Sequence, residues 1–155
     1  MNPFQPGGTQ MSPVERSLQR CSDPLIKHLP VLGDHRGSLI AIEGGSTVPF
    51  DVKRIYYIFG TQPGVERGFH AHVVLRQLAV CVAGSCEMIL DDGRERTTYL
   101  LDRPDRGLLI QAMMWREMRN FSADAVLLVL ADHAYDEADY IRDYDRFLET
   151  VNSLT

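Results

Sequence analysis

The feature that most constrains the fold is a succession of short apolar segments that begins near Leu25 and continues to Ala131. The segments alternate apolar and polar residues or are rich in β-branched and aromatic ones, and turn residues separate them. Nothing between them has helical spacing. The expected strands are 38–43, 54–59, 67–72, 75–84, 85–93, 96–101, 106–110, 114–121 and 125–131. This pattern predicts an all-β sandwich or barrel.

The two ends of the chain differ from this pattern. Residues 1–23 are rich in proline, glycine and serine without periodicity, which predicts a flexible N-terminal arm. From Asp143 to Leu154 the spacing is helical, and a short C-terminal helix is expected with one apolar face: Tyr144, Phe147, Leu148 and Val151. A chain of 155 residues has room for one sizeable domain, which we place at residues 24–155.

Composition excludes several classes of protein. No apolar run approaches the roughly 20 residues that a membrane helix needs, and the N-terminus lacks the pattern of a signal peptide. The net charge is −5, from 16 basic and 21 acidic residues, which does not favour a nucleic-acid surface. The basic residues are 14 arginines and only two lysines, Lys27 and Lys53. Arginine suits carboxylates and phosphates, so an anionic ligand stays open beside ordinary surface charge.

The cysteines are three in number, Cys21, Cys81 and Cys86, without a CxxC pair. An odd count and the absence of an export signal predict a reducing, cytoplasmic setting. Cys81 and Cys86 lie in apolar strands on either side of a turn, and we expect both to be small buried residues.

The segment 64–84 contains the pair His70-Ala71-His72. In a strand, side chains alternate with period two, so both imidazoles point to the same side. A polar outer face is the alternative to an internal site. Gly64 precedes His70 by six positions and Gly84 follows His72 by twelve. This spacing resembles the first conserved motif of cupins, jelly-roll β-barrels in which such a pair and a following glutamate bind a metal. The resemblance implies a cupin-type jelly-roll β-barrel with a short C-terminal helix.

Two of the four metal-ligand positions of cupins carry other residues here. The glutamate position falls at Gln77 and the histidine of the second motif falls at Met118. Zinc and iron sites generally use at least three protein ligands of histidine, cysteine or carboxylate type. The sequence therefore predicts a site without metal.

Histidines without a metal are free for proton transfer, because imidazole titrates near neutral pH. The only carboxylate on or next to the histidine strand is Glu66, which makes His70 and His72 the expected acid/base groups. Arg54 and Tyr56 share one face of the preceding strand. Arg67 lies on the histidine strand and Arg116 on a later one. These residues suit a polar, phosphorylated substrate; packing for Tyr56 and surface exposure for Arg116 are the alternatives.

Five blocks make the resemblance more specific. They are DHRGSLIAIE (34–43), VKRIYYIFG (52–60), RGFHAH (67–72) with Gln77, LDDG (90–93) and residues 115–148, which include YDEADYIRDYD. They are similar to the nucleotide-sugar 3,4-ketoisomerases, which act on dTDP-4-keto-6-deoxyglucose. The similarity covers about residues 24–150.

The resemblance implies an isomerase without metal or cofactor that moves the keto group of a dTDP-linked hexose from C4 to C3 through an enediol. It implies His70 and His72 as catalytic residues and Arg54 and Tyr56 as substrate contacts; we expect Arg67, Gln77 and Arg116 to bind substrate too. It also implies a cytoplasmic homodimer with exchanged N-terminal strands. The product would supply 3-amino-3,6-dideoxyhexose synthesis for surface glycans such as O-antigen or S-layer glycan.

The chain departs from the family at two places. Val73 stands where lysine often follows the histidine pair, and Ala112-Met113 replace prolines before Trp115. A non-catalytic nucleotide-sugar-binding cupin is therefore the alternative. A metal-dependent cupin oxygenase is disfavoured by Gln77 and Met118.

Overall fold

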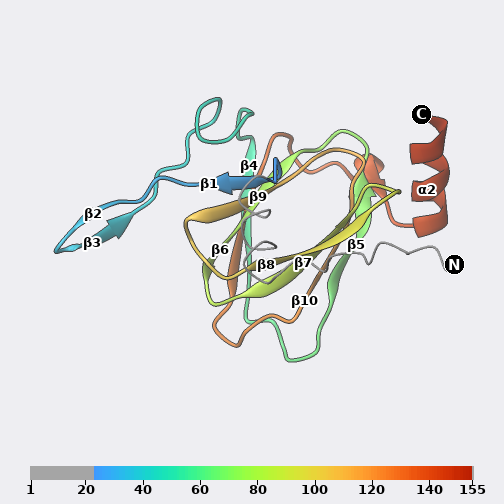
Figure 1. The fold of residues 1–155 in the computed structure, drawn as a ribbon. Coiled ribbons are helices and arrows are strands. Elements are labelled where there is room, and N and C mark those ends of the chain that lie inside the picture. Colours follow the sequence, from blue (N-terminus) through green and yellow to red (C-terminus); the bar gives the residue numbers. More distant parts are fainter. Residues whose placement is uncertain (1–22, 155) are drawn as a thin grey trace, which may run out of the picture.

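The computed structural model describes residues 23–154. Of the predicted N-terminal arm only Asp23 belongs to this range, so the rest of that prediction lies outside the described residues. Strands dominate, and α2 (Tyr144–Ser153) follows them at the C-terminal end (Figure 1). The predicted all-β class with a short C-terminal helix is confirmed. No helix within the described range is long and apolar enough to cross a membrane.

Ten strands form two five-stranded antiparallel sheets. The first sheet, in the order β1-β9-β6-β11-β4, contains β1 (Ile26–His28), β4 (Arg54–Phe59), β6 (Gln77–Ala83), β9 (Arg106–Ile110) and β11 (Val126–Ala131). The second, in the order β12-β5-β10-β7-β8, contains β5 (Arg67–His72), β7 (Cys86–Asp91), β8 (Arg96–Leu101), β10 (Trp115–Arg119) and β12 (Tyr140–Ile141). The sheets face each other and are not closed into a continuous hydrogen-bonded barrel.

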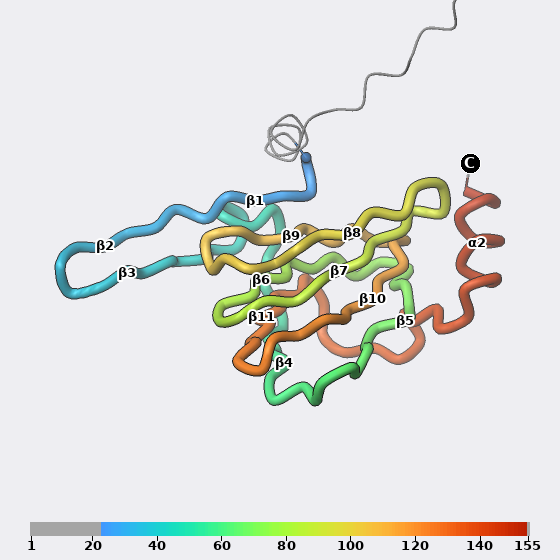
Figure 2. The backbone as a smooth tube through the Cα atoms, turned by 60° about the horizontal axis from the view of Figure 1, so that its bottom comes forward, coloured from blue at the N-terminus to red at the C-terminus, as the bar shows by residue number. Residues whose placement is uncertain are grey.

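A separate hairpin, β2 (Leu32–Asp34) and β3 (Gly37–Leu39), projects away from the two sheets (Figures 1 and 2). The expected strand 38–43 is wrong beyond Leu39. Residues 40–43 instead run along the outer face of the first sheet, where Ile40 and Ile42 pack against a buried apolar cluster. The apolar alternation of residues 40–43 arises because the segment packs on the face of a sheet, and not because it is a strand of that sheet.

The space between the sheets holds the main core. Its members come from both sheets, for example Ala79 and Leu127 from the first and Met88 and Leu90 from the second, all at most 1% exposed. Burial of each large apolar side chain stabilises the fold by roughly 1.5–3 kcal/mol. Cys81 and Cys86 belong to this core, as the sequence predicted; Cys21 lies outside the described residues.

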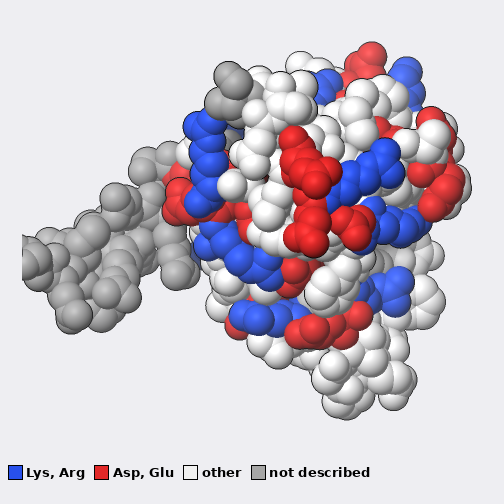
Figure 3. All heavy atoms as spheres, turned by 90° about the vertical axis from the view of Figure 1, so that its right-hand side faces the viewer, with Lys and Arg blue, Asp and Glu red and all other residues white. Residues whose placement is uncertain are grey.

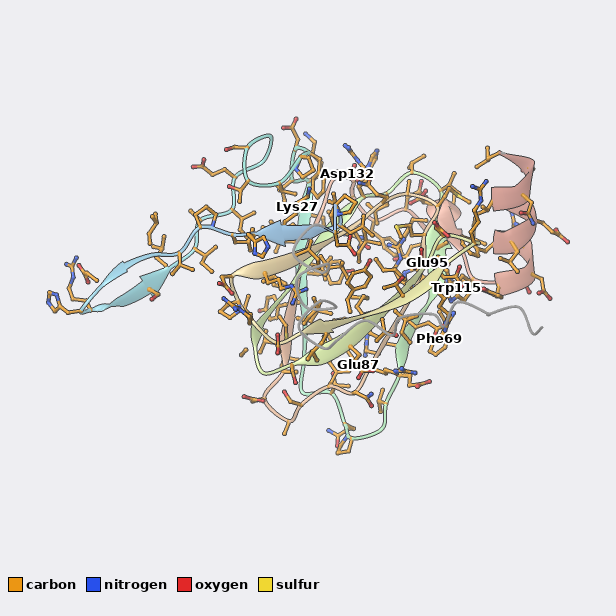
Figure 4. All side chains as sticks on the ribbon, viewed as in Figure 1. Lys27, Phe69, Glu87, Glu95, Trp115 and Asp132 are labelled. Atoms are coloured by element: carbon orange, nitrogen blue, oxygen red, sulfur yellow. The ribbon has the colours of Figure 1, made fainter. Side chains whose placement is uncertain are left out.

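The C-terminal helix covers part of the outer face of the second sheet. Asp143 caps it by accepting a hydrogen bond from the backbone N–H of Arg146, at 2.8 Å. Phe147 is fully buried against Ala71 and Trp115, and Figure 4 shows Trp115 on the side of the sheet near the helix. Seen from the helix side, basic and acidic side chains are interleaved (Figure 3). This face therefore lacks the single-sign surface that nucleic acid favours.

Candidate active site

The histidine strand β5 presents two different faces. Ala71 points outward and is buried under the helix, so the alternation directs His70 and His72 to the interior between the sheets. A β-bulge precedes them: the register with β10 shifts between Arg116 and Glu117. Phe69 is the extra residue of the bulge; Gly68 beside it has a φ of 91°, and a Cβ there would meet the Arg116 carbonyl oxygen at 2.7 Å. Only glycine fits this close approach.

The two imidazoles lie in edge-to-face contact, with ring centroids 4.9 Å apart. Tyr140 on β12 packs against both, at 5.0 Å from the His70 ring and 4.2 Å from the His72 ring. His70 lines a cavity of about 550 Å³, a size that suits a small-molecule ligand. The residues around this cavity are Arg54, Tyr56, Ile58, Val65, Glu66, Arg67, Gly68, His70, Met118, Tyr140 and Arg142.

His72 lies deeper and is held by a carboxylate. Its Nδ1 is 3.0 Å from Oδ2 of Asp139, whose Oδ1 also accepts the backbone N–H of Val74 at 2.8 Å. An ionised carboxylate can only accept, so Nδ1 of His72 carries the proton and Nε2 keeps its lone pair. Asp139 thus fixes both the orientation and the tautomer of a ring that is 2% exposed.

The electrostatic surroundings keep both rings neutral. Burial, helped by the positive charge of Arg116, lowers the pKa of His70 to about 4. The same two causes, burial first and then the charge of Arg116, also lower the pKa of His72. Nδ1 of His70 is buried with no hydrogen-bond partner of good geometry among the described residues. At neutral pH the site therefore presents imidazole as a base rather than imidazolium as an acid.

A buried hydrogen-bond chain crosses from one sheet to the other beside these rings. Nη1 of Arg116 donates to Oε1 of Gln77 at 2.6 Å, and Nε2 of Gln77 donates to the hydroxyl of Tyr56 at 2.9 Å. Arg116 and Gln77 are each 2% exposed. Burial lowers the pKa of Arg116 to about 10, which leaves the guanidinium charged at neutral pH.

Two arginines at the cavity lie over aromatic rings. The guanidinium of Arg54 is 5.4 Å from the ring centre of Tyr56 and 5.7 Å from that of Tyr135. The guanidinium of Arg142 is 4.2 Å from the ring centre of Tyr140. With Arg67 in the same lining, the cavity combines positive charge with flat apolar surface. This combination suits an anionic ligand with a ring.

The cupin fold raises the question of a metal, and the residues present do not fit one. Gln77 and Met118 stand at two ligand positions, and the amide oxygen of Gln77 is already engaged by the charged Arg116. No group of three histidine, cysteine or carboxylate side chains in residues 23–154 could hold an ion. Placing a divalent cation beside a buried guanidinium would also be strongly unfavourable.

The structure brings the predicted site residues into one region at two depths. Arg54, Tyr56, Arg67 and His70 line the cavity, whereas the other three lie behind its wall: His72, Gln77 and Arg116. That all seven act on substrate stays a prediction.

Sequence reasoning assigned no role to Asp139, Tyr140 or Arg142. Asp139 reaches His72 across 67 residues of sequence, and no local pattern on the histidine strand indicates this partner. The motif YDEADYIRDYD contained these residues, and its density of aromatic and charged side chains after the last long strand was the available signal.

Fold and site together define a class: a cupin-type jelly roll whose interior presents neutral imidazoles, a phenol and guanidinium groups from the protein itself. A comparison with family models matches residues 22–152 to the family described as FdtA, WxcM-like, C-terminal. The chain belongs to this family, which confirms the resemblance seen in the sequence.

Individual relatives agree with this family assignment. The TDP-4-oxo-6-deoxy-alpha-D-glucose-3,4-oxoisomerase of Aneurinibacillus thermoaerophilus is 53% identical over 121 residues, covering 78% of this chain and 87% of that protein. A 3,4-ketoisomerase from Helicobacter canadensis superposes with a TM-score of 0.80 at 53% identity, over 82% of this chain and 96% of its own. The ketoisomerase QdtA from Thermoanaerobacterium thermosaccharolyticum, in a histidine-to-asparagine variant bound to TDP-4-keto-6-deoxyglucose, gives 0.81 at 38% identity, over 83% and 93%.

Proposed function

We propose that this chain isomerises a dTDP-4-keto-6-deoxyhexose to the corresponding 3-keto sugar. The observation that carries the proposal is a neutral imidazole, His70, which lines the same cavity as Tyr56. The relatives support the substrate class: one is named for this reaction, and another was solved with the keto sugar bound.

The chemistry needs a base and a hydroxyl-proton donor on the same cavity. His70 takes the proton from C3, and Tyr56 donates its hydroxyl proton to the C4 oxygen, which gives a C3–C4 enediol. The C3 hydroxyl then returns a proton to Tyr56 and becomes the keto group, while C4 receives the proton held by the imidazole. The reaction conserves protons: the sugar loses one proton from C3 and one from the C3 oxygen, and it gains one at C4 and one on the C4 oxygen.

The remaining residues serve this step in three ways. We place Arg54 and Arg67 on the diphosphate, because guanidinium pairs well with phosphate oxygens and both line the cavity. His72, oriented by Asp139 and in contact with His70, completes the acid/base pair. Gln77 and Arg116 support the cavity wall from behind and reach the sugar only through Tyr56.

The direct test is incubation of the purified chain with dTDP-4-keto-6-deoxyglucose, followed by NMR of the sugar. We expect the 3-keto product, a substrate class for an aminotransferase that makes a 3-amino-3,6-dideoxyhexose. Saturable binding of the nucleotide sugar without turnover would instead support the non-catalytic binding protein. If the chain neither binds nor turns over the nucleotide sugar, both the isomerase and the non-catalytic binding protein are contradicted.

The proposal includes a homodimer with exchanged N-terminal strands. The projecting hairpin exposes Leu32 and Leu39 by 59% and 57%, and strand β4, at the edge of its sheet, exposes Ile55, Tyr57 and Phe59 by 60–66%. An unpaired edge and exposed apolar side chains of this kind favour pairing with a second copy. Light scattering should report a dimer that Leu32→Ser/Leu39→Ser weakens; a wild-type monomer at micromolar concentration would contradict it.

A cytoplasmic location belongs to the same proposal. Both described cysteines, Cys81 and Cys86, are free and buried, as expected in a reducing compartment.

A further inference from the structure

The hydrogen-bond chain from Arg116 through Gln77 to Tyr56 has only one arrangement of donors and acceptors that satisfies all three side chains. It draws on three strands, since Arg116 lies on β10, Gln77 on β6 and Tyr56 on β4. The first two side chains are buried, and the third reaches the cavity.

Arginine fixes the orientation of the amide. A guanidinium has five donors and no acceptor, so the Gln77 atom at 2.6 Å from Nη1 must be its oxygen. The amide nitrogen therefore faces Tyr56. An amide N–H₂ only donates, so the phenol oxygen accepts this bond at 2.9 Å. The orientation follows from chemistry and not from a choice between two amide flips.

The Tyr56 hydroxyl therefore does not donate its single proton to Gln77. Among the described residues the hydroxyl accepts this one hydrogen bond and donates none. Its open side is the cavity, which Tyr56 lines together with His70.

We propose that Gln77, held by Arg116, is a positioning residue that keeps the Tyr56 hydroxyl proton directed into the cavity, toward the oxygen atoms of the sugar. This inference rests on the proposed isomerisation, in which Tyr56 lends and recovers that proton. Burial raises the pKa of Tyr56, and the hydrogen bond from Gln77 and the charges of Arg116 and Arg54 oppose this rise. The same bond thus stabilises the phenolate while its proton is on the sugar.

Glutamate at position 77 would reverse the last bond of the chain. A carboxylate has nearly the shape of the amide and pairs with Arg116, but it can only accept. The Tyr56 hydroxyl would have to donate to it, and its proton would turn away from the cavity. Gln77→Glu therefore changes the direction of one hydrogen bond with little change of volume.

The kinetic experiment compares Gln77→Glu, Tyr56→Phe and the double variant in the full chain, with dTDP-4-keto-6-deoxyglucose and chelator present. We expect kcat to fall about 100-fold in each single variant, the scale of an acid/base contribution, with KM nearly unchanged. The double variant should be no slower than Tyr56→Phe alone, because Gln77 acts through Tyr56. Losses that multiply would overturn the inference. Asn152→Asp, on the exposed face of α2, is the matched control and should keep wild-type rates.

The spectroscopic experiment needs no substrate. The charged groups that face Tyr56 are Arg54 on its own strand and Arg116 on β10, and the titratable phenol that faces it is Tyr140 on β12. Ultraviolet titration of the phenols, with Tyr56→Phe as the reference, isolates Tyr56. In Gln77→Glu its apparent pKa should rise, because a neighbouring carboxylate disfavours phenolate. An unchanged titration overturns the inference, whereas a wild type without turnover overturns only the proposed function.

A second variant covers the case in which Gln77→Glu does not fold. Gln77→Leu/Arg116→Met removes both buried polar partners together, a change that proteins tolerate better than the loss of one. It also removes the donor to Tyr56, so a comparable loss of kcat is expected. Wild-type turnover by this double variant would contradict the positioning role.

Discussion

The interior between the two sheets has a polar half and an apolar half, and the same strands build both. Strand β6 begins with Gln77 in the polar half and carries Cys81 in the apolar half, and both side chains are buried. Strand β10 likewise carries Arg116 behind the cavity wall, and Met118, which lines the cavity and also packs in the apolar core. Two-residue periodicity selects inward positions in both halves alike. The difference is that buried polar groups need hydrogen-bond partners, and these come from distant parts of the chain: Asp139 for His72 and Gln77 for Arg116.

This contrast separates stability from function. The apolar half contributes through area removed from water, which any well-packed residue of similar volume supplies. The polar half contains the charge of Arg116 and the carboxylate of Asp139, whose burial is costly unless each group is paired. Such groups are kept at a site because they set the proton positions of His72 and Tyr56, and not because they hold the fold together.

The largest expected effect lies in the polar half. His70→Asn keeps a polar side chain but removes the titratable imidazole that lines the cavity, so kcat should fall by ~10²-fold or more. Urea unfolding should change little at neutral pH, since His70 supplies little apolar burial. A variant that folds and retains near-wild-type turnover of the dTDP-4-keto sugar would disprove the assignment.

The matched change in the apolar half should show the opposite behaviour. Leu127 is fully buried, and Leu127→Ala should lower the free energy of unfolding by about 2–5 kcal/mol. Turnover per folded molecule should stay within a few-fold of wild type. A loss of kcat comparable to that of His70→Asn would remove the distinction between the halves.

The next effect concerns the carboxylate behind His72. Asp139→Asn can present an amide N–H₂ to Nδ1, which would favour the other tautomer and move the lone pair away from Nε2. We expect kcat to fall roughly 10-fold, at or below the low end of acid/base contributions, with KM little changed. Asp102→Asn, in an exposed loop, is the control. Equal rates for the two variants would show that Asp139 does not orient the ring.

Acid should affect the polar half more than the apolar half. His70 has an ordinary pKa of 6.5 when unfolded and a pKa of about 4 when folded. Between these values the unfolded chain binds more protons, so stability is complete above pH 6.5 and falls as the pH drops toward 4. The full difference corresponds to about 3 kcal/mol. Urea unfolding at pH 7 and pH 5 should show a smaller decrease in His70→Asn; an equal decrease would contradict the shift.

Sequence patterns predicted the long strands well, because periodicity and β-branched residues act locally. The expected strand 54–59 coincides with β4. The two-residue strand β12 was missed, since its pairing with His72 and Ala71 depends on a partner far along the chain. The same limit applies to the site. The HxH spacing identified His70 and His72, but nothing local links His72 to Asp139 or shows that Arg116 crosses to Gln77.

The smallest expected effect is that of removing metal ions, and it tests whether the polar half can do without one. In metal cupins a divalent cation would supply the positive charge at the histidine pair. Here Arg116 supplies a fixed positive charge at that place. It lies directly across from His70, on the neighbouring strand β10 of the same sheet, and its guanidinium donates a hydrogen bond to the Gln77 oxygen.

Because this charge is covalently attached and buried, dialysis cannot remove it, and it repels a divalent ion. Turnover after treatment with a chelator should therefore equal that of untreated protein, measured with dTDP-4-keto-6-deoxyglucose by NMR. Added zinc should not raise the rate. Activity that disappears with chelator and returns with one divalent ion would show that the polar half works as a metal site after all, with Arg116 displaced from Gln77.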